Sequence, residues 1–480
     1  MNTKLTLLQQ NDTHGCLEAH PEFFWHSDRP VYRNAGGFDR IASYVKQLRK
    51  RSSNVLFVDG GDVFHGTAPL VLSEGNMMTE LLNAMGLDAM VPGNWDYAYG
   101  PEQLHRLSTQ LKFPVLAANL HSNDPNLIYE PYVIKEFQGC RVGIVGLTYP
   151  HVHETMPPSF SEHVKFTLGT TELTTLIPRL RAEEHVDLIV VLSHMGLPLD
   201  IKLASLVPGI DILLSGHSHD RIERPIVTNG TFIVQSGANG SFIGRIDLEY
   251  DGTRITEIRH ELVTLFEDEY ASDPETADII QRIISPYADI LSPAAGKLMT
   301  PLHRMTLNEA PMDRLITDAY KHATGADVTF SHGWRYGAPV LPGTLATKDL
   351  YNIIPTNPRI FMMELEGKDI LNALETNLEQ VMAPDPFQQK GGYLLRSSNL
   401  AMAFKPYNPR GHRIQHIEIG GRELDLHKTY RVAGGGEQVL KKYKEGRKLL
   451  EIDAHEAIRA YLDHFPQGLA VDDKIYIHNI

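Results

Sequence analysis

The stretch LTLLQQNDTHG, residues 5–15, is an apolar strand pattern that stops abruptly at polar residues. Similar short apolar runs recur through the first half of the chain, with amphipathic segments such as GFDRIASYVKQLRK between several of them. These runs are NVLFVDGGD, DAMVPGNWD, FPVLAANL, RVGIVGLTY, DLIVVLSHMG, IDILLSGHSH and TFIVQSGANG. The alternation of strand and helix patterns predicts an α/β fold.

Candidate ligand side chains come directly after several of these strand patterns. Ligands of open α/β sheets bind outside the carboxyl ends of the strands, so we expect these side chains to converge there. Taken singly, each of them could be a turn, cap or loop residue. Their recurrence after successive strands instead favours one shared site, formed by Asp12, His14, Asp62, Asn94, His194, His217 and His219.

The side-chain types in this set suit two divalent cations. In the DTH and GHSH motifs the candidate ligands are two residues apart, so both can point to the same face of an extended segment. Asp62 lies beside two glycines, and its carboxylate is the group able to bridge two cations. A mixed nitrogen and oxygen set without thiolates suits manganese, zinc, iron, cobalt or nickel. We expect manganese or zinc.

Composition favours a soluble, two-domain protein. The 480 residues are 42% hydrophobic and 22% charged, and the net charge of −14 argues against a nucleic-acid partner. No stretch approaches the ~20 apolar residues of a membrane helix, and no export segment is recognisable. The only cysteines, Cys16 and Cys140, are far apart and favour a reducing compartment. We therefore predict a cytoplasmic protein.

The character of the sequence changes after residue 262. We predict a catalytic domain over residues 1–262 and a polar helical linker over residues 263–295. A second domain should follow over residues 296–480, with its own helix MDRLITDAYKHATG and strand patterns such as ADVTFSH.

The motifs NDTHG, GGD, GN, LSHMG and GHSH, in this order, resemble those of the calcineurin-like metallophosphoesterases. The second domain resembles the C-terminal substrate domain of the 5′-nucleotidases. The resemblance implies a four-layer αββα catalytic sandwich followed by a smaller α+β domain. It also implies that one cation is held by Asp12, His14, Asp62 and His219, the other by Asp62, Asn94, His194 and His217. A hydroxide shared by the cations would be the nucleophile.

The chain departs from the 5′-nucleotidase pattern at two positions that matter for the mechanism. That pattern reads G-N-H-E-F-D, and its histidine, oriented by the final aspartate, assists at the substrate phosphate. Here the motif is Gly93-Asn94-Trp95-Asp96-Tyr97-Ala98, which keeps the asparagine and lacks both members of the pair. A tryptophan donates one N–H and cannot transfer a proton. His65 is a candidate replacement, with a surface loop imidazole as the alternative reading.

A tryptophan at this position also resembles the thiosulfohydrolase branch of bacterial sulfur oxidation, which hydrolyses a sulfonate from a carrier-protein cysteine. The segments SHGWRYGAPVLPG and APDPFQQKGGYLLR of the second domain also resemble the thiosulfohydrolases more than the nucleotidases. Arg335 is a candidate catalytic and substrate-binding residue in either case. Tyr393 follows two glycines, as a base-stacking ring of nucleotidases does. Further candidate substrate contacts are Trp95, Trp334 and Tyr336. Packing in the domain core or its cleft is the alternative role of Tyr393, Tyr336 and Trp334.

The sequence thus predicts a dinuclear metal hydrolase of the 5′-nucleotidase superfamily that acts on a phosphomonoester, a nucleotide in the first instance. One alternative is thiosulfohydrolase-like cleavage of an S-sulfonate, with a carrier-protein thiol as partner. The other is a non-catalytic binding protein that has kept its metals. In each case the expected ligand is a small anion, with no nucleic acid or membrane involved.

Overall fold

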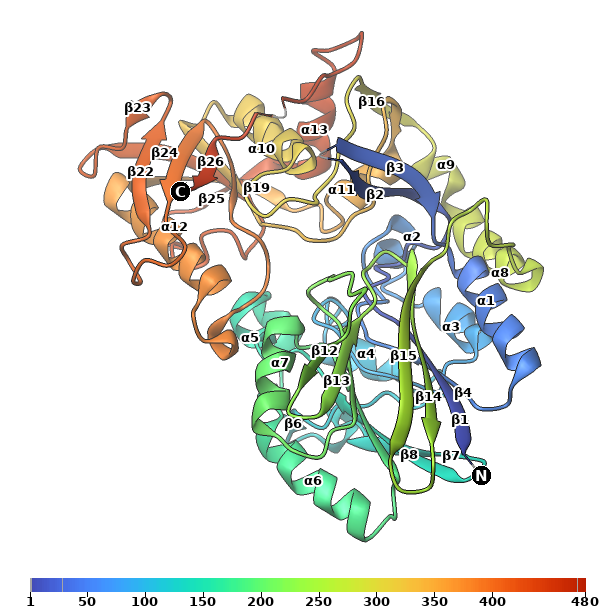
Figure 1. Ribbon diagram of the computed structural model, residues 1–480. Helices are drawn as coiled ribbons and strands as arrows, with labels where there is room; N and C mark the ends of the chain where they lie inside the picture. The colour runs from blue at the N-terminus through green and yellow to red at the C-terminus, as the bar shows by residue number, and fades with distance from the viewer. Residues whose placement is uncertain (1, 28, 473) are drawn as a thin grey trace. The chain divides into compact units, whose positions relative to one another are not determined.

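The computed structural model describes residues 2–27, 29–472 and 474–480. The chain forms two compact units, and the greater part of the second is coloured from yellow to red in Figure 1. Unit 1 consists of Met1–Phe24 and Val31–Pro286, and unit 2 of Trp25–Pro30 and Tyr287–Ile480. None of the described helices is long and apolar enough to cross a membrane.

Unit 1 contains two large sheets. The first has the strand order β15 (Ile255–Thr264), β14 (Phe242–Tyr250), β1 (Thr3–Gln10), β4 (Val55–Asp59) and β5 (Ala89–Met90). The second has the order β12 (Ile226–Thr228), β13 (Thr231–Gln235), β11 (Ile212–Ser215), β10 (Leu188–Ser193), β8 (Cys140–Leu147) and β7 (Tyr132–Phe137). The strands β1, β4 and β5 run parallel, as do β8, β10, β11 and β13, so their carboxyl ends share an edge within each sheet.

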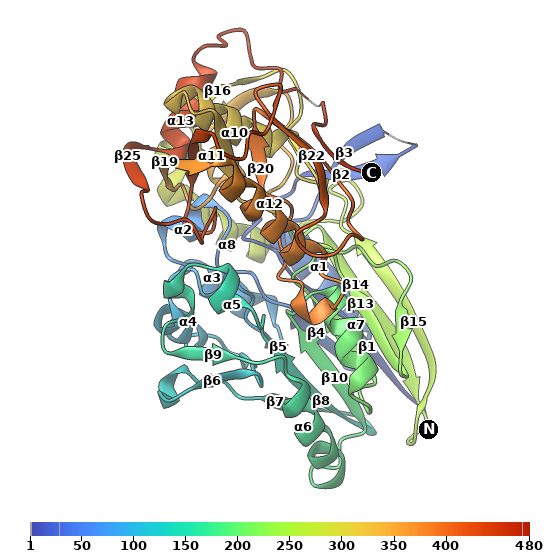
Figure 2. The same ribbon diagram turned by 90° about the vertical axis from the view of Figure 1, so that its left-hand side faces the viewer.

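The two sheets pack face to face around one apolar core. Leu7 and Val58 of the first sheet and Val190 and Leu214 of the second belong to the same buried cluster. On the outer faces, α1 (Phe38–Arg51) packs on β4, and α7 (Leu197–Leu206) packs on β11 and β13. Figure 2 shows α7 and α6 (Thr170–Ala182) beside the second sheet. This is the expected four-layer αββα sandwich.

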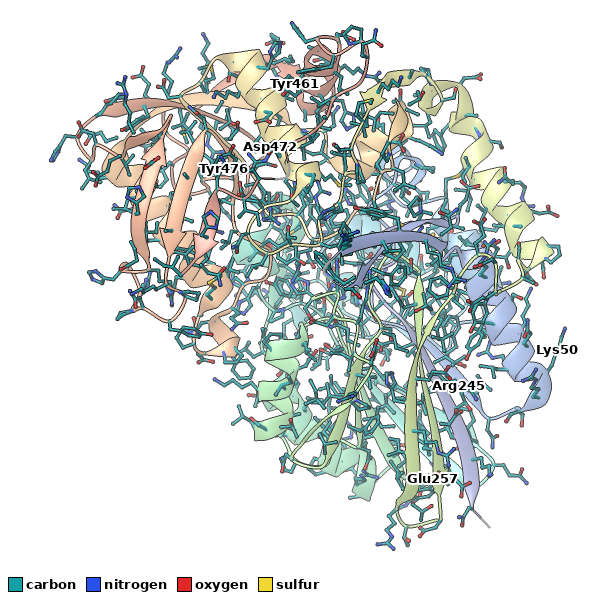
Figure 3. The ribbon with its side chains drawn as sticks, turned by 45° about the horizontal axis from the view of Figure 1, so that its top comes forward. Lys50, Arg245, Glu257, Tyr461, Asp472 and Tyr476 are labelled. Atoms are coloured by element: carbon teal, nitrogen blue, oxygen red, sulfur yellow. The ribbon has the colours of Figure 1, made fainter. Side chains whose placement is uncertain are left out.

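The antiparallel edge of the first sheet is buried on one face only. Along β14, the buried Ile246 and Leu248 alternate with the partly exposed Arg245 and Asp247, which form a 2.8 Å ion pair. Arg245 on β14 and Glu257 on the neighbouring β15 are labelled in Figure 3. This alternation is typical of antiparallel strands with one solvated face.

The predicted linker, residues 263–295, is not a separate segment. Its first residues complete β15, and its helix α8 (Pro274–Ile284) packs against α1 and α3 (Met78–Met85) inside unit 1, as Figure 1 shows for α1. Lys46 on α1 forms ion pairs of 2.6 Å with Asp273 and 3.0 Å with Glu275. The polar composition that suggested a linker belongs to the solvent face of an amphipathic helix.

The strands β2 (His20–His26) and β3 (Arg29–Ala35) pair with each other, and the division between the two units runs through both of them. The shorter elements of unit 1 are α2 (Ala68–Leu72), α4 (Pro101–Ser108), β6 (Leu120–Ser122), η1 (Pro125–Leu127), α5 (Val152–Thr155), η2 (Pro158–Ser161) and β9 (Val164–Phe166).

Unit 2 is an α+β domain with a mixed five-stranded sheet. The strand order is β20 (Arg396–Ser398), β17 (Val328–Ser331), β24 (Thr429–Gly435), β19 (Arg359–Glu366) and β25 (Lys448–Asp453). A second sheet contains β23 (Arg422–Glu423), β22 (Ile414–Ile419), β21 (Leu400–Phe404) and β26 (Ile477–Asn479), and a two-stranded sheet pairs β16 (Ala294–Leu298) with β18 (Gly343–Ala346). The helical elements are η3 (Ser285–Tyr287), α9 (Ala288–Leu291), α10 (Pro311–Thr324), α11 (Thr347–Ile353), α12 (Gly367–Met382), η4 (Pro386–Gln388) and α13 (Ala454–Leu462).

We expect the core between the two sheets of unit 1 to control its stability. Leu214 is 1% exposed within that core, so Leu214→Ala should lower the free energy of unfolding by about 2–5 kcal/mol, measured by urea denaturation. The matched control, Leu206→Ala, removes a leucine that is 53% exposed on α7 and should change stability by less than about 0.5 kcal/mol. Equal effects of the two substitutions would contradict the assignment of this core.

Candidate metal centre

The structure brings the predicted ligands together at the carboxyl ends of five parallel strands. Each strand supplies one or two of them: β1 leads to Asp12 and His14, β4 to Asp62, β5 to Asn94, β10 to His194, and β11 to His217 and His219. The titratable residues form two groups, in each of which the ligand atoms lie within 4.8 Å of one another. The groups are Asp12, His14 and His219, and Asp62, His194 and His217.

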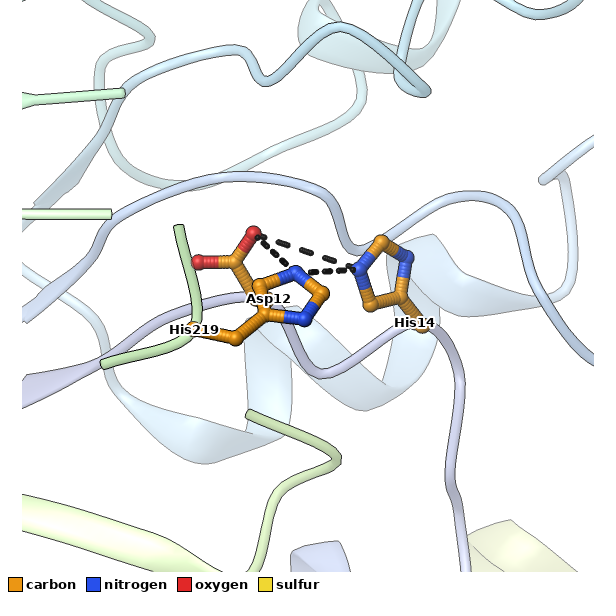
Figure 4. A group of neighbouring side chains, drawn as sticks. All are labelled: Asp12, His14 and His219. Atoms are coloured by element: carbon orange, nitrogen blue, oxygen red, sulfur yellow. Dashed lines mark hydrogen bonds and ion pairs between the residues drawn. The ribbon is translucent and has the colours of Figure 1, made fainter. Parts of the chain in front are cut away.

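The first group presents three ligand atoms to a common point (Figure 4). Nε2 of His14 and Nε2 of His219 are 3.2 Å apart, and Oδ1 of Asp12 lies 3.1 Å from His219 Nε2 and 3.9 Å from His14 Nε2. The other carboxylate oxygen, Oδ2, accepts a hydrogen bond of 2.8 Å from the backbone N–H of His217. That hydrogen bond holds the Asp12 carboxylate with Oδ1 toward the two imidazoles.

Asp62 lies between the two groups. Its Oδ2 is 3.8 Å from Nε2 of His14, in the first group, and 3.3 Å from Nε2 of His194, in the second. Its Oδ1 accepts a 2.8 Å hydrogen bond from the backbone N–H of Trp95. One carboxylate within reach of imidazoles from both groups has the arrangement that a bridging ligand of a two-metal site requires.

The second group is oriented by hydrogen bonds from behind. Nδ1 of His194 donates to the carbonyl of Gly60 at 2.5 Å, which directs Nε2 into the site, as is common for metal-binding histidines. Oδ1 of Asn94 lies 2.8 Å from Nδ1 of His217, and the Asn94 amide nitrogen donates to Sδ of Met156 at 3.6 Å. The Asn94 carbonyl oxygen therefore faces the same group.

Five of the seven predicted ligands have a left-handed backbone. Their φ angles are 51° for Asp12, 46° for His14, 60° for Asp62, 70° for His217 and 63° for His219. Such conformations cost about 1–3 kcal/mol each in a residue with a side chain, and they cluster at functional sites. The neighbouring packing leaves little freedom here: a Cβ at Gly93 would lie 2.0 Å from Oδ1 of Asp62.

Asp96 organises the loops that carry Asp62 and Asn94. Its carboxylate accepts hydrogen bonds of 2.8–2.9 Å from the backbone N–H groups of Asp62, Val63, Phe64 and Gly93. Burial, together with the nearby Asp62 charge, raises the pKa of Asp96 to about 6. The sequence alone did not predict this role of Asp96. The only indication of it was an acidic residue two positions after Asn94.

The buried carboxylates and imidazoles of the centre shift one another's pKa values. Asp12 and Asp62 are 0% and 1% exposed, yet the surrounding imidazoles hold the pKa of each below its usual value despite the opposing effect of burial. Burial lowers the pKa of His14 to about 3, whereas the Asp62 and Asp12 carboxylates raise that of His194 to about 10 against the effect of burial.

This donor set fits divalent metal ions. No described residue gives the buried Nε2 of His194 a well-directed hydrogen bond, although it faces two buried carboxylates. Cations placed between those oxygens and the imidazoles would satisfy both. The mixed nitrogen and oxygen donors do not select one metal.

His65, the candidate for proton transfer, is buried and not on the surface. It is 3% exposed, and its ring stacks on Trp95 with centroids 4.7 Å apart and planes 16° from parallel. The alternative reading as a surface loop imidazole was therefore wrong. Burial lowers the pKa of His65 to about 4, so the ring is neutral near pH 7. Its catalytic role stays a prediction.

The predicted substrate residues of unit 2 lie on two adjoining loops. The backbone N–H of Tyr393 donates to the carbonyl of Gly333 at 2.9 Å, next to the segment that carries Arg335. Trp334 and Tyr336 are 4% and 3% exposed, with ring centroids 5.6 Å apart. Their burial is consistent with the packing alternative, and the substrate-binding roles stay predictions.

A buried charge cluster that the sequence did not reveal supports these loops. Asp313 pairs with Arg304 at 2.7 Å and with Arg396 at 3.0 Å, and all three residues are 1% exposed. Arg304 also donates to the carbonyl of Tyr336 at 2.7 Å. The partners come from distant parts of unit 2, so spacing in the sequence gave no signal for them.

We expect Asp62→Asn to reduce the number of bound cations. The amide keeps the shape of the side chain but removes the charge shared by the two groups, so manganese or zinc retained after dialysis should fall from two per chain to one or none, measured by elemental analysis. Asp278→Asn, at an exposed position on α8, should retain the wild-type content. Two cations in the Asp62→Asn protein would contradict a bridging role.

Comparisons with known proteins agree with this geometry. The family model "Calcineurin-like phosphoesterase" matches residues 5–221, and the model "5′-nucleotidase, C-terminal domain" matches residues 294–435. Among curated proteins, the trifunctional nucleotide phosphoesterase protein YfkN of Bacillus subtilis is 25% identical over 94% of this chain, which spans only 33% of the length of YfkN.

Two solved structures from Thermus thermophilus are similar over nearly the whole chain. The sulfate thiohydrolase SoxB, in complex with glycerol, has a TM-score of 0.91 and 26% identity, covering 99% of this chain and 96% of SoxB. A 5′-nucleotidase precursor has a TM-score of 0.88 and 25% identity, covering 100% and 99%. The chain belongs to the calcineurin-like phosphoesterases with a 5′-nucleotidase C-terminal domain, and it is a hydrolase of that family.

Proposed function

We propose that the protein is a dinuclear metal-dependent phosphomonoesterase and that its substrate is a nucleotide. The position of Asp62 carries the proposal, because Oδ2 of this residue lies within 4 Å of imidazole nitrogens in both ligand groups. One cation would be held by Asp12, His14, Asp62 and His219, the other by Asp62, Asn94, His194 and His217. Manganese and zinc both suit these donors.

When bound, the two cations would activate a water molecule and neutralise charge on the phosphoryl oxygens. The chain itself fixes the geometry of this centre. The Gly60 carbonyl sets the tautomer of His194, and Asp96 holds the loops of Asp62 and Asn94 in register. Such positioning matters because small displacements of reacting groups cost large factors in rate.

Two features of unit 2 support a nucleotide as the substrate. Arg335 carries a planar, permanently charged guanidinium that suits a phosphate. Tyr393, which follows Gly391 and Gly392, offers an aromatic face for a base. The solved 5′-nucleotidase precursor of Thermus thermophilus shares this architecture over nearly its full length.

An S-sulfonated thiol, free or on a carrier protein, is the second candidate substrate. Trp95 replaces the histidine that would protonate an alkoxide leaving group, and a thiolate leaves without that help far more readily. The Trp95 backbone N–H donates to Asp62, and the buried Trp95 ring contacts the rings of His65 and Phe160. The similarity to the sulfate thiohydrolase SoxB favours the same alternative.

A non-catalytic binding protein is the remaining alternative. It would have no chemical reason to keep both ligand groups with Asp62 between them. Five predicted ligands are also held in left-handed conformations, which lower the stability of the folded protein. Such strain is typical of functional sites, where the surrounding structure maintains it.

A substrate panel tests these proposals. After removal of metals with EDTA, the protein should be inactive, and manganese or zinc should restore hydrolysis of AMP, with S-sulfocysteine assayed in parallel. Asp62→Asn should lower kcat/KM by about 10²-fold or more, since it removes charge from both cation sites, whereas Asp278→Asn should not change it. Preference for S-sulfocysteine would favour the second candidate, and no hydrolysis in any metal-loaded sample would refute both.

A further inference from the structure

Residues 149–160, here called the 149–160 segment, pack against the second ligand group of unit 1. The ring of Tyr149 stacks on that of His217 with centroids 4.1 Å apart and planes 29° from parallel. Sδ of Met156 accepts the 3.6 Å hydrogen bond from Asn94, and the Phe160 ring meets Trp95 edge-on at 5.8 Å. The segment thus contacts His217, Asn94 and Trp95. The short helix α5 (Val152–Thr155) lies between Tyr149 and Met156 in the chain.

An imidazole and a carboxylate on this segment form a pair. Nδ1 of His151, at the N-terminal cap of α5, lies 3.1 Å from Oε1 of Glu154. A carboxylate accepts and does not donate, so Nδ1 carries the hydrogen, and Nε2 becomes the ring atom that would hold and transfer a proton. A carboxylate in this position also orients an imidazole and stabilises its protonated form.

The pair lies close to the second ligand group. The Tyr149 ring separates the two imidazoles, with its centroid 5.8 Å from that of His151 and 4.1 Å from that of His217. The His151 side chain is 11% exposed and that of Glu154 35% exposed, so the pair lies at the boundary between the buried centre and its surface.

We propose that His151, positioned by Glu154, is the proton donor to the leaving group, in place of the histidine and aspartate that Trp95 and Ala98 replace. The inference rests on the proposed phosphomonoesterase function. As the oxygen of water forms its bond to phosphorus, the bond to the ester oxygen breaks and leaves its electron pair on that oxygen. The His151 imidazolium transfers the proton from Nε2 to this oxygen, which gives the alcohol. The attacking water releases one proton to the solvent and the imidazole takes up one proton from the solvent, so the net reaction converts ester and water into alcohol and phosphate.

His151 fits this role better than His65. One face of the His65 ring is covered by Trp95, with planes 16° from parallel, and burial keeps the ring neutral near pH 7. His151 instead has a carboxylate partner in hydrogen-bonding distance, which would stabilise the protonated ring. Its signal in the sequence, H-x-x-E in the stretch PHVHETMPP, was hidden because the stretch reads as an ordinary loop.

The test compares a poor and a good leaving group. AMP releases an alkoxide that needs a proton, whereas p-nitrophenyl phosphate releases a stabilised phenolate. In His151→Gln, kcat for AMP should fall by about 10²-fold, and kcat for p-nitrophenyl phosphate by less than about 5-fold. Glu154→Gln, which removes only the orienting charge, should show the same bias with a smaller loss. Cation content and melting temperature should match the wild type in both variants.

His153→Gln is the matched control, because this ring lies on the same short helix, is 52% exposed, and approaches Glu154 only to 3.9 Å. It should leave both activities unchanged. An active wild type whose His151→Gln and Glu154→Gln variants lose the two activities equally, or lose neither, would overturn this inference alone. A metal-loaded wild type that hydrolyses neither ester would overturn the proposed function and this inference with it.

Discussion

The architecture of unit 1 depends on placing one buried carboxylate, that of Asp62, between two sets of imidazoles. A carboxylate that is 1% exposed is strongly disfavoured unless positive charge or hydrogen bonds compensate for the lost water. Here one oxygen accepts the Trp95 N–H, and the other faces His14 and His194. The imidazole of His194, whose pKa is raised to about 10, supplies part of the compensation, and divalent cations bound by the two ligand groups would supply more. The parallel strands, the left-handed turns and the Asp96 network hold the side chains of both groups in place.

The local backbone shows how this arrangement is maintained. Left-handed φ angles at Asp12, His14, Asp62, His217 and His219 turn each chain sharply after its strand, so that the side chains point back toward the sheet edge. Glycine at position 93 is required for a different reason, because any Cβ there would displace the Asp62 carboxylate. The centre therefore combines strained ligands with tight packing, as expected where surrounding structure fixes a functional geometry.

The sequence predicted the parts of this protein that depend on local pattern. The ligands could be recognised because they follow strand patterns closely, and the α/β class because strand and helix patterns alternate. The αββα sandwich itself was implied by the resemblance to the calcineurin-like metallophosphoesterases. The buried stack of His65 on Trp95, the four hydrogen bonds of Asp96 and the Asp313 cluster could not be predicted, because each depends on partners distant in the chain. The separate linker was expected because α8 is polar on its outer face, whereas three buried isoleucines, Ile279, Ile280 and Ile283, attach it to unit 1.

The chemistry of the leaving group connects these observations. Trp95 removes a proton donor from the usual position, and the 149–160 segment, which packs against the second ligand group, carries an imidazole and carboxylate pair. A hydrolase that relocates its proton donor can keep its metal ligands unchanged, because the ligands and the donor act on different oxygens of the substrate.

The most direct test of the central claim is anomalous diffraction at the manganese edge from crystals grown with Mn²⁺. The account predicts two peaks about 3.5–4 Å apart, with Oδ2 of Asp62 between them. The first peak should be ligated by Asp12, His14 and His219, and the second by Asn94, His194 and His217. A single peak, or peaks remote from Asp62, would contradict it.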